Sequence, residues 1–159
     1  MIKKMDKPID YIQHQWEKGL LPGFDCIVYK NGNVTIANTY EVKDSNSQKS
    51  KRYWFPLCDT TIDSVENYDD DIWTNVDIYK GAIDFQNGKI VFGDGSMGNE
   101  GFIASTDKNN KLNWAIFFTF SNPIIKAEIT NDELICTSDA TTISIQLKNL
   151  TKISVELKW

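Results

Sequence analysis

The stretch KIVFGDGSMGNEGFIASTDKNNKLNWAIFFTFSNPIIK, residues 89–126, decides the fold of this chain. It opens on an apolar run at 90–92 and then breaks into four glycines within 93–101. The longest apolar segment of the sequence follows, and residues two apart in it share one face of a strand: Leu112, Trp114, Ile116, Phe118 and Phe120. Because Ala115 and Phe117 on the other face are also apolar, we predict a central strand that is covered on both sides.

Strand and turn patterns continue on both sides of this stretch. Residues 24–42 are predicted to form a hairpin, because two β-rich runs flank Asn31-Gly32, which accept the positive φ angles of a tight turn. Residues 78–159 are predicted to form a β-meander with a second hairpin turn at Asn87-Gly88. Strands at intervals of about ten residues predict a mainly β fold, either an antiparallel β-sandwich or a curled sheet.

One N-terminal α-helix is predicted at residues 6–18. Asp6 can cap it and Pro8 suits its first turn. Apolar residues recur at spacings of three and four along it, at Ile9, Ile12, Trp16 and Leu20. With 159 residues, 41% of them hydrophobic, the chain suits a single domain spanning 1–159.

The composition points to a cytoplasmic protein. Three cysteines, Cys26, Cys58 and Cys136, are odd in number and far apart, which favours reduced thiols over a disulfide framework. The N-terminus lacks the apolar core of a signal peptide, and no run reaches transmembrane length, so we expect no membrane association. With one histidine and scattered cysteines, we expect neither a metal site nor a cofactor.

The motifs of common enzymes are absent or incomplete. Residues 93–98 satisfy G-x-G-x-x-G, but a strand and not a helix is predicted to follow, so a glycine-rich turn explains them better than a phosphate site. His14 has no accompanying G-x-S-x-G nucleophile motif. The run Asp69–Asp71 fails the EF-hand pattern, because Thr74 and Lys80 stand at its sixth and twelfth positions, although a looser divalent site stays open. A carboxylate pair for glycoside hydrolysis also stays open, but we expect that the protein is not an enzyme.

The negative charge of the chain is concentrated in one place. Its net charge is −5, yet residues 57–84 hold eight carboxylates against Lys80 alone, which is −7, so the remainder sums to +2. We predict that 57–77 is mostly an acidic loop segment, in which one helical turn near 60–67 stays open. Aromatic residues interleaved with such charge are typical of a protein interface for a basic partner, so we predict a partner-binding set: Asp59, Asp63, Glu66, Tyr68, Asp69, Asp70, Asp71, Trp73 and Asp77. A solvated, self-repelling loop is the alternative, and the absence of a basic stripe argues against direct nucleic-acid binding.

The glycine-rich GDGSMGNEGFIAS (93–105) and the downstream LNWAIFFTFSNPI (112–124), on a small acidic chain, resemble the immunity proteins of bacterial toxin–immunity systems. Contact-dependent growth inhibition and related polymorphic toxin systems are the nearest in kind. The resemblance implies a protein that binds a cognate toxin domain, often a nuclease, and blocks its active site or substrate path. It carries over no binding residue, because these families share no fixed binding motif.

A ligand-binding β-domain is a second hypothesis for the function. Trp16, Trp114 and Trp159 lie on apolar faces, where core packing explains them. Trp54 and Trp73 are predicted to be available to a partner, and together with the glycine loop they could bind a carbohydrate or another small ligand.

Overall fold

The computed structural model describes residues 10–47 and 49–158, and within them the fold is mainly β, as predicted. The helices are α1 (Tyr11–Glu17) and α2 (Ile62–Tyr68). The strands are β1 (Leu20–Pro22), β2 (Cys26–Tyr29), β3 (Asn33–Lys43), β4 (Ser50–Thr61), β5 (Trp73–Asn75), β6 (Asp77–Phe85), β7 (Gly88–Asp94), β8 (Gly101–Thr106), β9 (Leu112–Phe118), β10 (Lys126–Thr130), β11 (Glu133–Thr137), β12 (Thr141–Gln146) and β13 (Asn149–Leu157).

A seven-stranded antiparallel sheet of order β4-β3-β2-β9-β8-β7-β6 is the middle layer of the fold. β9 lies at its centre, so the predicted central strand is confirmed. Ile116 and Phe118 are buried on one face, and Ala115 and Phe117 on the other. Leu112 was expected on the face of Ile116 but packs on the opposite one, because the register shifts where Thr106 on β8 meets Leu112.

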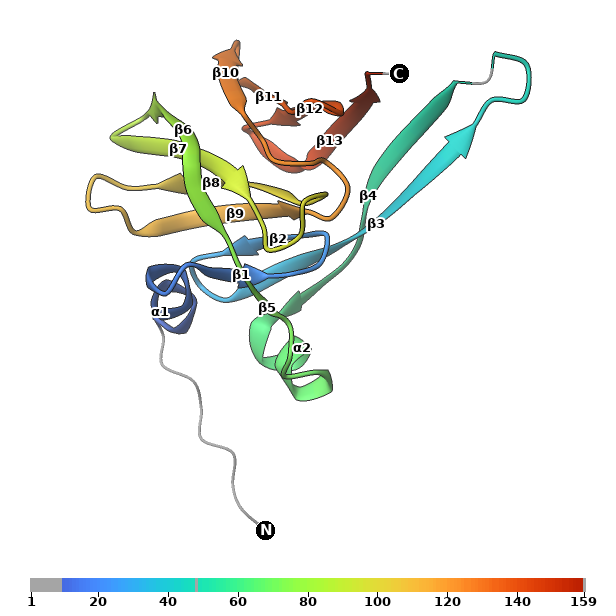
Figure 1. Ribbon diagram of the computed structural model, residues 1–159. Coiled ribbons are helices and arrows are strands. Elements are labelled where there is room, and N and C mark those ends of the chain that lie inside the picture. Colours follow the sequence, from blue (N-terminus) through green and yellow to red (C-terminus); the bar gives the residue numbers. More distant parts are fainter. Residues whose placement is uncertain (1–9, 48, 159) are drawn as a thin grey trace.

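A separate four-stranded sheet, β10-β11-β12-β13, covers one face of the large sheet (Figure 1). In that view the orange and red strands lie above the green, yellow and blue ones. Between the layers is an apolar core that includes Ile27, Ile103, Ile116, Leu134 and Ile143. β13 lies against β4 and β10 against β6, so both edges of the small sheet meet the edge strands of the large one. The predicted sandwich is therefore the observed architecture, and the 78–159 meander divides into two sheets after β9.

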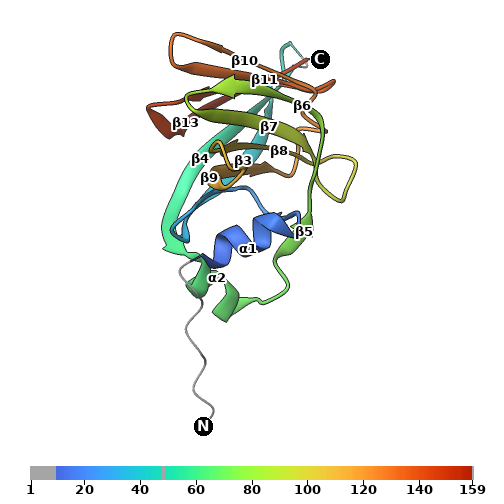
Figure 2. The ribbon, with the colours of Figure 1, turned by 90° about the vertical axis from the view of Figure 1, so that its left-hand side faces the viewer.

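The other face of the large sheet carries a second core under α1, α2 and the two-stranded β1-β5 sheet (Figure 2). Ile12 and Trp16 of α1 and Ile62 of α2 are buried there with Phe102 and Phe117. The predicted stripe of the N-terminal helix is confirmed for Ile12 and Trp16, although Leu20 belongs to β1. The predicted first turn of that helix lies outside the described residues, and so does Trp159.

The predicted hairpins form, with different turns from those expected. In the 24–42 hairpin, Gly32 has a φ of +91° and its amide donates to the carbonyl of Tyr29, which makes a three-residue loop and not a two-residue turn. In the β6–β7 hairpin the turn residues are Gln86 and Asn87. Gly88 belongs to β7, where a Cβ would lie 1.9 Å from the carbonyl oxygen of Thr106.

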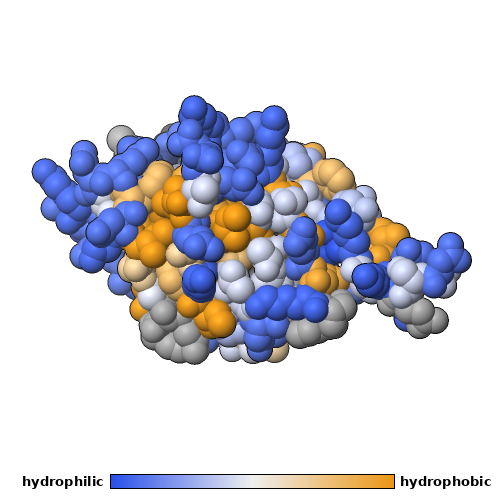
Figure 3. All heavy atoms as spheres, turned by 90° about the horizontal axis from the view of Figure 1, so that it is seen from above, coloured by the Kyte–Doolittle hydropathy of each residue, from blue (hydrophilic) through white to orange (hydrophobic). Residues whose placement is uncertain are grey.

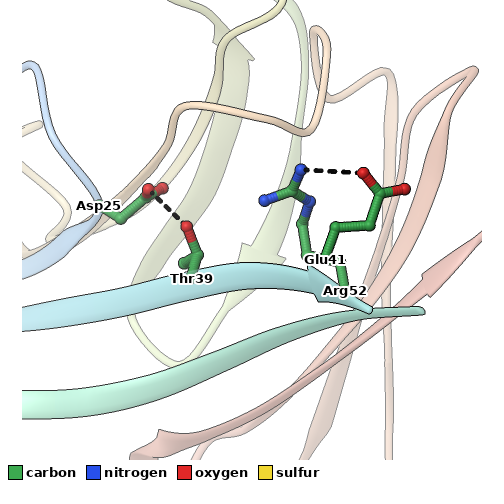
Figure 4. A network of polar contacts seen from close by, with 4 residues as sticks. All are labelled: Asp25, Thr39, Glu41 and Arg52. Atoms are coloured by element: carbon green, nitrogen blue, oxygen red, sulfur yellow. Dashed lines mark hydrogen bonds and ion pairs between the residues drawn. The ribbon is translucent and has the colours of Figure 1, made fainter. Parts of the chain in front are cut away.

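β3 and β4 extend beyond the body of the sheet as a long hairpin arm (Figure 1). Viewed from above, the tip of this arm projects at the right and is hydrophilic (Figure 3). The inner face of the arm is bound to the protein body, because Thr39 donates to Asp25 Oδ2 at 3.0 Å (Figure 4). Asp25 also accepts from the backbone amide of Thr119 at 2.8 Å. Further out, Arg52 pairs with Glu41 at 3.9 Å on the same face.

Candidate functional site

The acidic segment is mostly regular structure, so the prediction of a loop over 57–77 is wrong. It comprises the end of β4, all of α2, β5 and the start of β6, and only 69–72 and 76 lie outside these elements. The Thr61 hydroxyl caps α2 by accepting the amide of Ser64 at 3.2 Å, and Ile62 anchors the helix in the core. The helical turn that the sequence left open near 60–67 is therefore present as α2.

α2 forms one side of an apolar groove. The groove has a volume of about 380 Å³ and is lined by Phe24, Ile36, Cys58, Thr60, Ser64, Val65, Tyr68, Asp69 and Ile72. At its rim the Tyr68 side chain is 96% exposed. A solvent-exposed aromatic ring beside an apolar groove is a candidate anchor for a partner protein.

Three carboxylates follow α2, and the first of them, Asp69, lines the groove. Asp69, Asp70 and Asp71 are exposed, and none of them forms an ion pair with the residues that the structure describes. Asp69 also shapes the loop, since its Oδ1 accepts the amide of Asp71 at 3.0 Å. These charges therefore face solvent and create a negative field next to the groove.

Two members of the predicted partner-binding set bind within the chain. Trp73 of β5 packs edge-on against Tyr11 of α1, with ring centroids 5.9 Å apart, and the Tyr11 hydroxyl hydrogen-bonds to Glu66 of α2. Burial, followed by this hydrogen bond, raises the pKa of Tyr11. Asp63, in the first turn of α2, adds to the same negative surroundings. Glu66 and Trp73 thus join α1, α2 and β5, which fixes the helix that carries the groove.

Asp59 and Asp77 lie apart from the groove. Asp59 projects from the opposite face of β4, where it accepts the Thr35 hydroxyl at 2.8 Å and lines a polar pocket of about 690 Å³. Burial raises the pKa of Tyr29 in that pocket, and the nearby Asp59 charge raises it further. Asp77 opens β6 directly opposite Asp94 of β7. The structure therefore brings together Tyr68 and the three following aspartates, and it does not bring together the whole predicted set.

The tryptophan–glycine platform of the second hypothesis does not form. Trp54 is only 3% exposed and lies in the core between the two sheets, so the prediction that it is available to a partner is wrong. The glycine loop is a turn between β7 and β8, as the turn interpretation of G-x-G-x-x-G expects. Its Met97 amide donates to the carboxylate of Glu100 at 3.0 Å, and Ser96 Oγ contacts Thr74 Oγ1 at 2.7 Å. The amide of Met97 in this loop is thus bound by a carboxylate.

The described residues give little support to the remaining candidates, which are catalysis through His14 and a metal site. His14 Nε2 lies 3.1 Å from Asp10 Oδ2 on the exposed side of α1. Within 10–47 and 49–158, no three histidine, cysteine or acidic side chains are placed to share a metal ion. No helix in that part of the chain is long and apolar enough to cross a membrane.

Sequence reasoning missed an exposed aromatic cluster on the hairpin arm. Tyr40, Tyr53 and Phe55 stack on its outer face, with ring centroids between 5.3 and 6.0 Å apart. The signal was present, because Tyr53 and Phe55 alternate with the buried Trp54 and must face the other way. Finding it also required the pairing of Tyr40 with Tyr53, which only the register gives.

No protein-family model matches the chain, and no curated protein matches it.

Proposed function

We propose that this protein is an immunity protein that binds a basic toxin domain, a nuclease being the best-suited class, and occludes the toxin's active site. The observation that carries the proposal is the apolar groove beside α2, which exposed Tyr68 and Asp69 line. Asp70 and Asp71 follow directly in the chain, and none of the three aspartates forms an ion pair within the described residues. Nucleases fit this surface because a protein that handles nucleic acid presents a basic face.

The two parts of this surface have separate roles in binding. The groove and Tyr68 offer apolar area, which supplies affinity when a partner side chain fills the depression. The charges of Asp69, Asp70 and Asp71 attract a basic partner over a distance of about 10 Å at moderate salt, which accelerates encounter. Inhibition of this kind requires charge and shape from the protein but no catalysis.

The state of the cysteines supports a cytoplasmic location for this inhibitor, where a delivered toxin would act. Cys26, Cys58 and Cys136 are all free thiols. Cys58 is exposed and lines the groove, where oxidation would alter the binding surface. A reducing compartment preserves it.

The test is a pull-down with this protein against the product of the adjacent upstream gene, followed by stopped-flow association with that product at several salt concentrations. Replacing Asp69, Asp70 and Asp71 together by asparagine keeps the loop hydrogen bond and removes three charges. We expect association at low salt to slow by about tenfold and its salt dependence to flatten.

A matched control changes the same charge elsewhere. Asp84, Glu128 and Glu156 are exposed on β6, β10 and β13, and converting them to Asn, Gln and Gln should leave association close to wild type. Equal effects of the two triple variants would show that only net charge matters, which would contradict a localised interface. Failure to detect a complex with the toxin domain would overturn the proposed function.

The polar pocket beside Asp59 supports a second candidate, the binding of a small polar ligand such as a carbohydrate. Tyr29, Thr35 and Asp59 offer hydroxyl and carboxylate groups in a concave site of about 690 Å³. Screening of sugars by thermal shift tests it, with Asp59→Asn as the variant that should abolish any shift. A ligand whose stabilisation survives Asp59→Asn binds elsewhere, which would exclude this pocket.

A further inference from the structure

The outer face of the hairpin arm exposes more apolar surface than a solvated hairpin requires. Tyr40 is 42% exposed and Phe55 47%, and Val42 and Leu57 are exposed beside them. Lys51 lies over the Tyr53 ring, with Nζ 5.5 Å from the ring centroid. Contiguous exposed apolar residues on a rigid element mark a contact surface.

This aromatic cluster is continuous with the groove beside α2. Ile36 and Cys58 line the groove and are paired across β3 and β4, and the next residues outward on the same face are Asn38 opposite Phe55 and Tyr40 opposite Tyr53. We call the whole surface, from the arm tip to the loop after α2, the outer stripe. Its order along the molecule is lysines, aromatic cluster, apolar groove and aspartates.

The two ends of the outer stripe carry opposite charge. Residues 41–52, at the tip, hold four basic and two acidic side chains, a net charge of +2. The Asp44 carboxylate there accepts the Asn46 amide and the Ser47 hydroxyl, which lower its pKa, so it is engaged in the turn itself. Lys49 and Lys51 are exposed. At the other end Asp70 and Asp71 are exposed, and their carboxylates form no ion pair within the described residues.

We propose that the outer stripe is the interface of a two-fold homodimer, in which the lysine tip of one copy lies on the aspartate loop of the other. A two-fold axis through the aromatic cluster makes every contact occur twice, so a surface charged oppositely at its two ends is complementary to an inverted copy of itself. From Ile36 to Lys43 the arm spans about 23 Å, at roughly 3.3 Å per residue, which separates the two charged zones enough for both to form at once. The aromatic clusters of the two copies meet at the axis, where a dimer buries its most apolar residues.

The two-fold arrangement predicts a pairing behaviour of charge-reversed variants that binding to a different protein does not predict. Reversing the tip charge, with Lys49→Glu and Lys51→Glu, gives a stripe that is negative at both ends. Reversing the loop charge, with Asp70→Lys and Asp71→Lys, gives one that is positive at both ends and keeps the hydrogen bond of Asp69. Each variant repels itself, but a mixed dimer of the two has an attractive contact at both zones.

The test is sedimentation velocity of the full chain from low micromolar concentration upward. We expect wild type to reach twice the chain mass, each variant alone to dimerise at least tenfold more weakly, and an equimolar mixture to form dimers again. A control with Glu128→Lys and Glu156→Lys changes charge away from the stripe and should dimerise as wild type does. Circular dichroism of each variant checks that it is folded.

Three outcomes would overturn the proposal. If the wild-type protein stays monomeric at its highest soluble concentration, the outer stripe does not form a homodimer and would bind another partner. A dimer that survives both charge reversals uses another surface. Variants that are folded and monomeric, but whose mixture stays monomeric, show that the two zones do not face each other. Because none of these measurements involves a toxin, their failure leaves the proposed function standing, and a missing toxin complex leaves the dimer standing.

Discussion

Replacing Gly93 by alanine should open one end of the β6–β7 pair. A Cβ at position 93 would lie 1.8 Å from the carbonyl oxygen of Asp77 and 3.0 Å from its carbonyl carbon. The obstacle is backbone, which cannot rotate away as a side chain does. Asp77 pairs with Asp94 here, and the register then shifts before Gly81 meets Phe92.

The size of the effect follows from this geometry. The Asp77 carbonyl must retreat by more than about 1 Å to reach a normal carbon–oxygen contact. A shift of that size breaks the hydrogen bonds of the pair at this end, each contributing about 1 kcal/mol, and loosens the packing beneath them. We expect a loss of about 2–4 kcal/mol in the free energy of unfolding. For a chain of this length that lowers Tm by roughly 6–12 °C.

Gly98 provides the matched control, because it belongs to the same glycine cluster. A Cβ there meets nothing within 4 Å, and its φ is outside the left-handed region. Gly98→Ala should change stability by less than about 0.5 kcal/mol, or stabilise slightly by restricting the unfolded chain. The measurement is urea unfolding followed by tryptophan fluorescence. The reasoning is refuted if Gly93→Ala unfolds with wild-type stability, or if the two variants are equally destabilised.

Three further predictions concern the thiols and Tyr11. In the native protein one thiol per chain, that of exposed Cys58, should react rapidly with a disulfide reagent, and mass mapping that finds Cys26 or Cys136 modified instead would contradict the burial. Burial raises the pKa of Cys26 and Cys136 above the ordinary value of 9.0, so the unfolded chain binds fewer protons than the folded one as pH rises past 9. The contribution of these thiols to the free energy of unfolding is therefore fully present below pH 9. Above pH 9 the free energy of unfolding should fall by up to about 1.4 kcal/mol per pH unit for each thiol. Alanine at both positions should flatten this slope in urea titrations at alkaline pH. Tyr11→Phe removes the hydrogen bond to Glu66 and should cost about 1–2 kcal/mol without loss of the sheet signal in circular dichroism, whereas an unchanged urea midpoint would show that this bond stabilises nothing.

The sheet architecture was predictable because its signal is local. The alternation from Trp114 to Phe118 with apolar residues on both faces defines a central strand without any knowledge of its neighbours. The hairpins followed from turn residues in the same way. The exception, Leu112, depends on a register shift, which is a property of two strands and cannot be read from one.

The candidate site was only partly predictable, because a run of charge does not reveal on which face each side chain lies. Asp59 and Cys58 are neighbours in sequence, yet they project from opposite faces of β4 into different pockets. Trp54 appeared available because polar loop residues precede it, but the alternation of β4 directs it into the core. The groove combines β3, β4 and α2 with Phe24, which precedes β2, and with the loop that follows α2, so it exists only after tertiary folding.

The proposed toxin interface and the proposed dimer interface overlap at the loop after α2, so one copy of the protein cannot use both at once. Asp70 and Asp71 would pair either with the lysine tip of a second copy or with a basic toxin. The lysine tip carries a net charge of only +2 and forms a small zone of contact, whereas a nuclease face is more extensively basic. By mass action, a partner that binds the same groups more tightly displaces the second copy. Self-association would then cover the exposed aromatic cluster while no toxin is present. Toxin binding would displace the second copy, because both contacts use Asp70 and Asp71 and the toxin contact would be the stronger.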